Sequence, residues 1–368
     1  MAYAIDTRCI HGEGHKNQDG NYAISYPIYQ TASFSHLTPG HNPTGFDYSR
    51  ESNPTRAYLE ETLSSLEGAC DTIAFASGMA AISTVFEYFQ PGDHIICGED
   101  LYGGAVRLLE QVCRKKGYEV EFADTTDLDA LKAALKENTR AIYFETPTNP
   151  MMHITDIRAV AELAHQAGAL VIVDNTFMTP YFQNPLKEGA DVVVHSGTKY
   201  LSGHNDTVCG FLCSGNQELA DRFRLLSKTT GATLGPFESW LCLRGLKTLA
   251  LRMERHKSNA EAVSRWLREQ SVVTNVYYAG SGMISFTVTS SEIAVAILKN
   301  IRLITFAESL GGTESLLTYP AVQTHPDVPR EQREKLGITD TLLRLSVGIE
   351  NPDDIIADLK QAFENAEK

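Results

Sequence analysis

The feature that most constrains this chain is a regular alternation of short apolar runs with helical segments between about residues 71 and 213. The apolar runs are DTIAFAS, HIICG, YEVEFA, RAIYFET, ALVIVD, ADVVVH and CGFLCS. The segments between them, such as LDALKAALKEN and DIRAVAELAHQAG, have helical periodicity, and the second ends in a glycine suited to a helix C-cap. This order predicts an α/β domain with a mostly parallel seven-stranded sheet, covered by helices on both faces.

The rest of the chain has other patterns, and its 368 residues exceed what one hydrophobic core usually supports. We expect three parts. Residues 1–60 form a Gly/Asn/Pro-rich arm that contains PIYQTASF and FDYSRESNPTR, and residues 61–245 form the large domain. Residues 246–368 form a smaller α+β domain, because GMISFTV, RLITFAES and LLRLSVGIE are spaced by helical segments.

Charge and composition exclude several classes of protein. The net charge is −14 and no stripe of Lys and Arg alternates with aromatic residues, so we expect no nucleic-acid partner. No apolar stretch approaches the roughly 20 residues of a membrane helix, and the N-terminus lacks the apolar core of a signal peptide. The seven cysteines have no disulfide-framework or metal-ligand spacing, although Cys209 and Cys213 lie close together. A cytoplasmic protein without a metal site is expected.

In a parallel sheet, ligands bind at the carboxyl ends of the strands, and the first strand ends here carry a turn and an aromatic ring. Ser77, Gly78 and Met79 stand at a strand-to-helix turn, where free backbone N–H groups can bind a phosphate. Tyr102, in DLYGG, could stack on a flat cofactor ring. Taken alone, the first motif is equally a tight turn and the second a core aromatic.

The later strand ends carry charged residues. Asp174 ends a very apolar strand, where a carboxylate needs a cation or strong donors, and it could hold a cationic ring nitrogen or simply cap a loop. Lys199 follows 25 residues later, one strand-helix-strand step, and is either a surface lysine or one that forms a Schiff base with an aldehyde. Ser196 and Thr198 supply hydroxyl groups for an anion. Together these features match the requirements of pyridoxal 5'-phosphate (PLP).

The chain resembles the Cys/Met-metabolism family of PLP enzymes, which includes cystathionine γ-synthase, cystathionine γ- and β-lyases and methionine γ-lyase. The motifs that carry the resemblance are YSRESNPTR, ASGMAAI, DLYGG, ETPTNP, VDNTF, HSGTKYLSGHND, ESLGGTESL and RLSVGIE, which span nearly the whole chain. The resemblance implies the aspartate aminotransferase-like fold of PLP-dependent transferases. It also implies a homotetramer built from catalytic dimers.

For the cofactor site, the resemblance implies Lys199 as the Schiff-base lysine and proton shuttle, with Asp174 on the pyridinium nitrogen and Tyr102 stacked on the ring. The phosphate would be bound by Gly78, Met79, Ser196 and Thr198 of one subunit and by Tyr48 and Arg50 of the neighbouring subunit, which the arm reaches.

For the substrate, the resemblance implies Arg344 on the α-carboxylate, with Ser309 and Asn149 as its helpers. Without the resemblance, a strand-edge salt bridge is the less favoured alternative for Arg344. Arg107 and Glu308 match positions that contact the distal carboxylate and the distal amino group of cystathionine-type substrates. Gly104 replaces the cysteine of methionine γ-lyases, Ala105 replaces a usual threonine, and the segment near Gly280 is shorter than in the family.

We therefore expect a transsulfuration-type enzyme that catalyses γ-elimination or γ-replacement on cystathionine or an O-acyl-homoserine. A cystathionine β-lyase or cysteine desulfhydrase is the alternative. An aminotransferase would explain Lys199, Asp174 and Arg344 but not YSRESNPTR or ESLGGTESL. An aldolase without PLP would be colourless, and a binding protein on an inactive enzyme fold would be expected to have lost Lys199 or Asp174.

Overall fold

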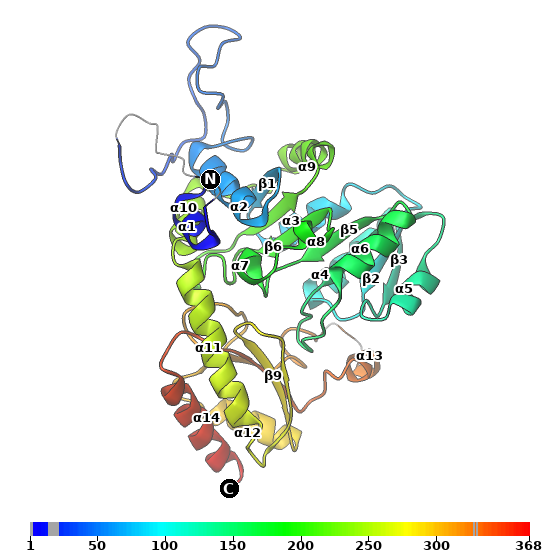
Figure 1. Ribbon diagram of the computed structural model, residues 1–368, viewed down its shortest axis with the longest axis vertical. Coiled ribbons are helices and arrows are strands. Elements are labelled where there is room, and N and C mark those ends of the chain that lie inside the picture. Colours follow the sequence, from blue (N-terminus) through cyan, green and yellow to red (C-terminus); the bar gives the residue numbers. More distant parts are fainter. Residues whose placement is uncertain (1–2, 14–21, 327, 329) are drawn as a thin grey trace.

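The computed structural model describes residues 3–13, 22–326, 328 and 330–368, and within them the chain forms two β-sheets. Figure 1 shows the two sheets in separate parts of the molecule, with α11 (Leu249–Leu267) running from one to the other. None of the helices in these ranges is long and apolar enough to cross a membrane.

The larger sheet has seven strands in the order β1-β7-β6-β5-β4-β2-β3, and β7 alone runs opposite to the other six. Its strands are β1 (Asp71–Phe75), β2 (His94–Gly98), β3 (Glu119–Ala123), β4 (Thr139–Glu145), β5 (Leu170–Asp174), β6 (Val192–Ser196) and β7 (Gly210–Ser214). Each apolar run of the sequence contributes one strand. The predicted mostly parallel seven-stranded sheet is therefore confirmed.

Helices cover both faces of this sheet, as a parallel sheet requires. On one face, α3 (Gly78–Phe86) and α9 (Gln217–Thr230) pack on alternate strand residues such as Tyr143, Ile172 and Val194. On the other face, α5 (Leu128–Ala134) and α6 (Ile157–Gln166) pack on the residues between them, such as Phe144 and Val173. The remaining helical segments of this region are α4 (Gly103–Leu108), a π-helical turn (Leu109–Cys113), a 3-10 turn (Arg114–Lys116), α7 (Thr179–Phe182), α8 (Pro185–Glu188) and α10 (Pro236–Leu246).

The smaller sheet has the strand order β10-β11-β12-β9-β8. Its strands are β8 (Val273–Tyr278), β9 (Met283–Val288), β10 (Thr305–Phe306), β11 (Leu316–Thr318) and β12 (Leu342–Ser346). It packs on α11, α12 (Ser291–Asn300) and α14 (Pro352–Ala366), while α13 (Arg330–Lys335) lies outside this core. Strands β8 and β11 and helix α13 were not predicted, and only two residues of RLITFAES form a strand.

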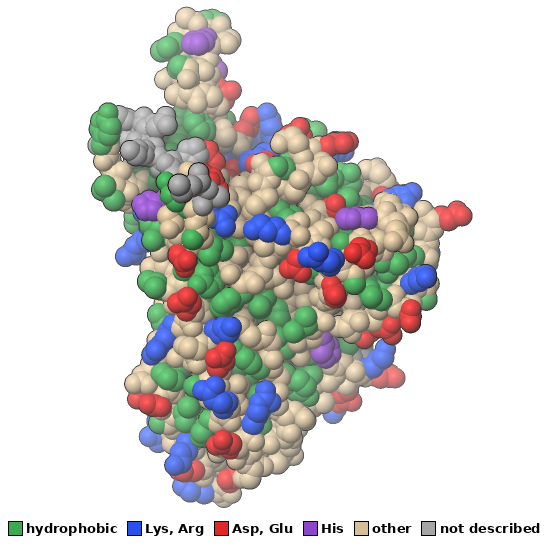
Figure 2. Space-filling view, viewed as in Figure 1, with side chains coloured by type: hydrophobic (Ala, Val, Ile, Leu, Met, Phe, Trp, Pro, Cys, Tyr) green, Lys and Arg blue, Asp and Glu red, His purple; other side chains and the backbone are tan. Residues whose placement is uncertain are grey.

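The described part of the arm begins with α1 (Ile5–His11), which the sequence did not predict because it is short and has no side-chain cap. It is held by tertiary packing: Cys9 is buried in a cluster with Leu63 and Met253. Residues 22–53 form only isolated bridges such as Ser33–Tyr48. Figures 1 and 2 show this segment projecting away from both sheets, and on the face drawn in Figure 2 acidic and basic side chains are interspersed.

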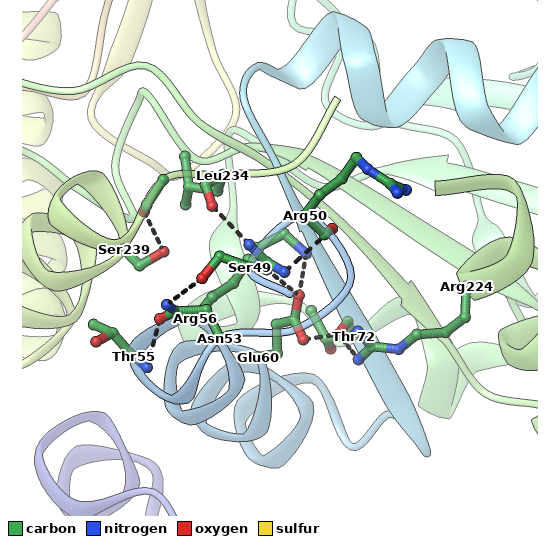
Figure 3. A network of polar contacts seen from close by, with 12 residues as sticks. Ser49, Arg50, Asn53, Thr55, Arg56, Glu60, Thr72, Arg224, Leu234 and Ser239 are labelled. Atoms are coloured by element: carbon green, nitrogen blue, oxygen red, sulfur yellow. Dashed lines mark hydrogen bonds and ion pairs between the residues drawn. The ribbon is translucent and has the colours of Figure 1, made fainter. Parts of the chain in front are cut away.

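A buried ionic network ties the base of the arm to the large sheet (Figure 3). Arg56, on α2 (Pro54–Glu67), donates to the carbonyl of Leu234 at 3.0 Å, and its Nε lies 3.7 Å from Glu60. Glu60 in turn accepts from the backbone N–H of Ala74 at 2.9 Å and from Arg224 at 2.8 Å. Because a buried charge is tolerated only when paired, this network fixes α2 against β1 and α9.

Candidate active site

A cavity of about 310 Å³ opens at the carboxyl ends of the strands of the large sheet. The residues that line it are Ser77, Gly78, Met79, Ile82, Tyr102, Glu145, Pro147, Asn149, Asp174, Thr176, Phe177, Ser196, Thr198, Lys199, Val208 and Leu310. This is the edge at which a parallel sheet places its ligands. Every cofactor residue predicted within a single subunit lies in this lining.

The two-residue period of the strands explains why the chemistry gathers on one face. Tyr143, Ile172 and Val194 belong to the core cluster under α3. The next residues of the same face along each strand are Glu145, Asp174 and Ser196. On this face of the sheet, a core residue and a cavity residue are therefore only two positions apart, and the last side chain of each strand lines the cavity.

The turn from β1 to α3 forms one wall of the cavity. Ser77 caps the helix by accepting from the backbone N–H of Ala80 at 3.1 Å. A Cβ on Gly78 would lie 2.9 Å from the Cβ of Ser196, so only glycine allows this close approach. The first turn of a nine-residue helix leaves backbone N–H groups without helical partners beside the Ser196 hydroxyl. A phosphate group fits this wall.

Thr198 shapes the turn that leads from β6 to Lys199. Its hydroxyl accepts from the backbone N–H of Cys209 at 3.0 Å and donates to the carbonyl of the same residue at 3.1 Å. These bonds join the turn to the start of β7. They hold Lys199 at the cavity rather than in solvent.

Lys199 is partly buried, and its Nζ donates to Ser309 Oγ at 3.3 Å. Burial lowers the pKa of Lys199 from 10.5 to about 8, and the charge of Arg344 acts in the same direction while Glu308 opposes it. An amine with this pKa is neutral in roughly a tenth of the molecules at pH 7, far more than an ordinary lysine. It can therefore act as a nucleophile or a proton acceptor.

Asp174 faces the cavity from the end of β5. One of its oxygens accepts from the backbone N–H of Thr176 at 3.0 Å and from the hydroxyl of the same residue at 2.5 Å. Burial raises the pKa of Asp174, whereas these two hydrogen bonds lower it. A carboxylate with its donors on one side and an open cavity on the other fits a protonated ring nitrogen.

Tyr102 lies in the same lining, directly before α4. Its backbone N–H donates to Glu145 Oε1 at 2.7 Å, which fixes the turn that carries the ring. A Cβ on Gly104 would meet Cε1 of Tyr102 at 2.4 Å and the sulfur of Met79 at 3.1 Å. The ring of Tyr102 therefore packs against the Cα of Gly104, where a side chain would have to fit. A cysteine at this position would displace that ring.

Glu145 is the site residue that the sequence analysis missed. It is buried, lines the cavity and pairs in register with Asp174 on the neighbouring strand. The signal was present, because RAIYFET ends in an acid just as ALVIVD does. Two apolar strands that end in carboxyl groups on the same face place both at the same cavity.

Arg344 lies on β12 of the smaller sheet and is buried. Its guanidinium donates to Asn149 Oδ1 at 2.7 Å, to the carbonyl of Ser309 at 3.1 Å and to the hydroxyl of Thr318 at 3.3 Å. Burial lowers the pKa of Arg344 to about 10, with Glu308 opposing the change. The strand-edge salt bridge considered from the sequence is not formed, since all three partners are neutral.

Ser309 joins Lys199 to Arg344. It accepts from Lys199 through its hydroxyl and from Arg344 through its carbonyl. Its backbone φ is 119°, a value that residues other than glycine rarely adopt. Strained residues of this kind concentrate at binding and catalytic sites.

A second, more open cavity of about 930 Å³ adjoins the first, and Thr198 and Val208 line both. It contains Glu308 and Ser309, so Glu308 lies in the space next to Lys199 rather than beside Asp174. Among the described residues, no group of His, Cys, Asp and Glu side chains is arranged to bind a metal ion.

Six predicted site residues do not line the cofactor cavity of their own chain. Glu308 and Ser309 line the larger cavity, and Arg344 reaches the lining through its bond to Asn149. The other three are Tyr48, Arg50 and Arg107. Tyr48 is exposed, and the guanidinium of Arg50 lies over its ring, 5.5 Å from the centroid. Arg50 also donates to the carbonyl of Lys228. Arg107 is exposed on α4, with its charge near enough to Tyr102 to lower the pKa of the phenol against the larger effect of burial.

Comparison with known proteins was consistent with this geometry. The family model described as "Cys/Met metabolism PLP-dependent enzyme" matches residues 6–364. A cystathionine γ-synthase of Haemophilus influenzae is 47% identical over 365 residues, covering 99% of this chain and 98% of that protein. A cystathionine β-lyase of Lactococcus lactis is 45% identical over 378 residues, covering 98% and 99%. The crystal structure of a cystathionine γ-lyase from Lactobacillus plantarum, complexed with L-serine, has a TM-score of 0.96 and 42% identity, covering 99% of this chain and 100% of that one.

Proposed function

The chain belongs to the Cys/Met metabolism family of PLP-dependent enzymes, and from that premise we propose that it catalyses γ-elimination or γ-replacement on cystathionine or an O-acyl-homoserine. The identities to the γ-synthase, β-lyase and γ-lyase relatives are too similar to choose among reactions. The observation that carries the choice is Glu308, which lines the larger cavity together with Ser309, the residue that accepts the hydrogen bond of Lys199. There its carboxylate can form an ion pair with the distal ammonium of a substrate.

PLP, when bound, supplies an electron sink for the carbanion formed at the substrate Cα. We assign the phosphate to the wall of Gly78, Met79, Ser196 and Thr198. With PLP bound, Asp174 would hold the proton on the ring nitrogen, Tyr102 would stack on the ring, and Lys199 would bind the aldehyde.

Arg344 binds the substrate α-carboxylate, and its bond to Asn149 aims the guanidinium at the cavity. Ser309 holds Lys199 at the same point. The free amine of Lys199 would take the proton from the substrate Cα and move protons at Cβ. Glu308 and Arg107 then select a distal group that carries both an ammonium and a carboxylate.

The arm completes the site in a neighbouring subunit. We propose that Tyr48 and Arg50 bind the phosphate of that subunit, because they are exposed and do not line the cavity of their own chain. We propose that two subunits form a catalytic dimer and that two dimers form a homotetramer. Within each subunit, residues 1–60 form the arm, 61–245 the cofactor domain and 246–368 the smaller domain. Residues 1–2 and 14–21 of this arm lie outside the described part of the chain.

The arm proposal is tested by mixing two inactive variants. Arg50→Ala and Lys199→Ala protein are unfolded, mixed and refolded together. Mixed dimers then contain one site with both residues intact, so activity returns to about a quarter of the wild-type value by random pairing. If Arg50 acts in its own subunit, no activity returns.

The reaction is tested by product analysis. Cystathionine and water give cysteine, 2-oxobutanoate and ammonia by γ-elimination, whereas β-elimination gives homocysteine, pyruvate and ammonia. An O-acyl-homoserine with cysteine tests γ-replacement, and cysteine alone tests desulfhydration. Dominant pyruvate formation would favour the β-lyase named among the relatives. Full activity of Lys199→Ala would overturn the assignment of Lys199.

We propose a cytoplasmic location because the cysteines of the chain are not paired in disulfides. All seven cysteines are free, and all of them except Cys70 are buried. Unpaired cysteines are typical of a reducing compartment. This supports the cytoplasm.

A further inference from the structure

Glu145 and Asp174 are the last residues of two adjacent parallel strands and are paired in register. Both side chains line the same cavity. Neighbouring strands lie about 4.8 Å apart, so the two carboxyl groups are close neighbours in a site of limited solvent access. Two carboxylates in such a site do not both ionise at neutral pH, because their charges repel and burial penalises each.

The groups that face Glu145 do not offset this penalty. They are Asp174 on β5, Asp100 after β2, Tyr102 before α4, Tyr143 on the same strand and Arg344 on β12. Burial raises the pKa of Glu145 well above its ordinary value, and Asp174 and Asp100 raise it further. Arg344 directs its hydrogen bonds to neutral partners. The donors to Glu145 are the backbone N–H groups of Tyr102 and Asn149, which carry no charge.

The donors around the pair decide which of the two acids keeps its charge. Asp174 accepts two hydrogen bonds from Thr176, one from the backbone and one from the hydroxyl. Glu145 Oε1 accepts the backbone N–H of Tyr102, a bond that a neutral carboxylic acid accepts as well through its carbonyl oxygen. At Asp174 the two donors of Thr176 oppose the effect of burial, whereas at Glu145 the charges of Asp174 and Asp100 act together with burial against the backbone donors.

We propose that Glu145 is a positioning residue that the fold keeps as a neutral carboxylic acid. In this form it anchors the turn of Tyr102 and leaves Asp174 as the single anion of the pair. The neutrality of Glu145 rests on the protein alone, whereas its consequence for PLP rests on the function proposed above. A charged Glu145 would compete with Asp174 for the proton of the ring nitrogen.

Infrared spectroscopy of the holoenzyme tests the protonation state directly. Protein labelled with carbon-13 at the glutamate side-chain carboxyls is measured at neutral pH, so that Asp100 and Asp174 do not contribute to the isotope-edited spectrum. We expect the C=O band of a protonated glutamic acid. It is absent from Glu145→Gln and retained in Glu137→Gln, a matched change on the surface. A band that persists in Glu145→Gln, or is missing from the wild type, overturns the proposal.

The dissociation constant of PLP tests the positioning role separately from catalysis. Glutamine keeps a neutral carbonyl acceptor for the N–H of Tyr102, so Glu145→Gln changes the constant by no more than about threefold. Glu145→Ala leaves that N–H without its partner and weakens binding about tenfold or more. Equal weakening by both variants would mean that the negative charge itself is needed, against the proposal. Failure of the wild type to bind PLP at all would instead overturn the proposed function, while the infrared result would still stand.

Discussion

Arg344 Nη1 donates a 2.7 Å hydrogen bond to Asn149 Oδ1, across 195 positions of sequence and from the smaller sheet to the edge of the larger one. The bond joins the smaller sheet to the lining of the cavity and leaves a buried guanidinium whose charge lowers the pKa of Lys199. The substrate pocket that we propose is therefore made by both sheets, and Arg344 is oriented by a residue that follows a strand of the larger sheet.

Replacing Arg344 by lysine tests this arrangement. A lysine keeps the charge but cannot bind both Asn149 and a carboxylate in a planar fork. We expect kcat/KM for the amino-acid substrate to fall about 10- to 100-fold, mainly through KM. Steady-state kinetics measure the effect, with the exposed Arg158→Lys as control. An unchanged KM would show that the carboxylate is bound elsewhere.

The lowered pKa of Lys199 predicts the pH dependence of cofactor binding. The neutral amine reacts with the aldehyde of PLP, and the pKa of Lys199 is lowered from 10.5 to about 8. The rate at which the PLP-free protein binds PLP should therefore rise with pH and level off above about pH 8. Borohydride trapping followed by mass spectrometry measures this rate. A rate that keeps rising toward pH 10.5 would mean that the site does not shift the pKa of the lysine.

Glu308→Gln is expected to change substrate preference rather than the chemistry. The side chain is exposed in the larger cavity, so its contact with a distal ammonium is partly screened. We expect kcat/KM for cystathionine to fall about fivefold, with little change for an O-acyl-homoserine, whose distal group has no ammonium. Competition between the two substrates measures the ratio, and Glu292→Gln on α12 is the surface control. An equal loss for both substrates would mean that Glu308 acts in the reaction steps that the two substrates share.

Glu60→Ala should destabilise the protein strongly. The substitution leaves the buried guanidinium of Arg56 without its carboxylate and removes the acceptor for Ala74 and Arg224 (Figure 3). Breaking a buried pair in this way costs about 3 kcal/mol. The midpoint of urea unfolding measures the loss, and the exposed Glu364→Ala should stay close to the wild type. A similar midpoint for both variants would show that the network contributes little.

The lowered pKa of His256 predicts how the free energy of unfolding depends on pH. It is buried, its Nδ1 lies 2.7 Å from the carbonyl of Val347, and burial lowers its pKa from 6.5 to about 4. Between these two values the unfolded chain binds a proton that the folded protein does not, so the free energy of unfolding falls as pH falls through this range. The contribution of His256 is about 3 kcal/mol.

We expect His256→Gln to flatten this part of the stability curve, measured by urea unfolding at a series of pH values. The exposed His41→Gln should leave the slope unchanged. Part of the slope should remain in His256→Gln, because burial also lowers the pKa of His325 to about 4. A curve of His256→Gln that superimposes on the wild type would contradict the assignment.

Much of the architecture could be predicted from local patterns, for physical reasons. The strands of the large sheet are continuous apolar runs because a parallel sheet is buried on both faces. Asp174 and Lys199 were recognisable because a charged residue at the end of such a run needs a partner or a function. By contrast, α1 and β8 were missed, because their stability comes from packing against distant elements rather than from their own pattern.

The sequence by itself determined the seven strands, the cavity at their carboxyl ends and the residues around Lys199. These features depend on apolar runs and their spacing, which are local properties of the chain. The tertiary structure decided which side chains meet. It paired Glu145 with Asp174 through strand register, brought Arg344 to Asn149 from the other sheet and placed Tyr48 and Arg50 outside their own cavity. Register and contacts between distant segments depend on how the elements pack together, and no local pattern contains that information.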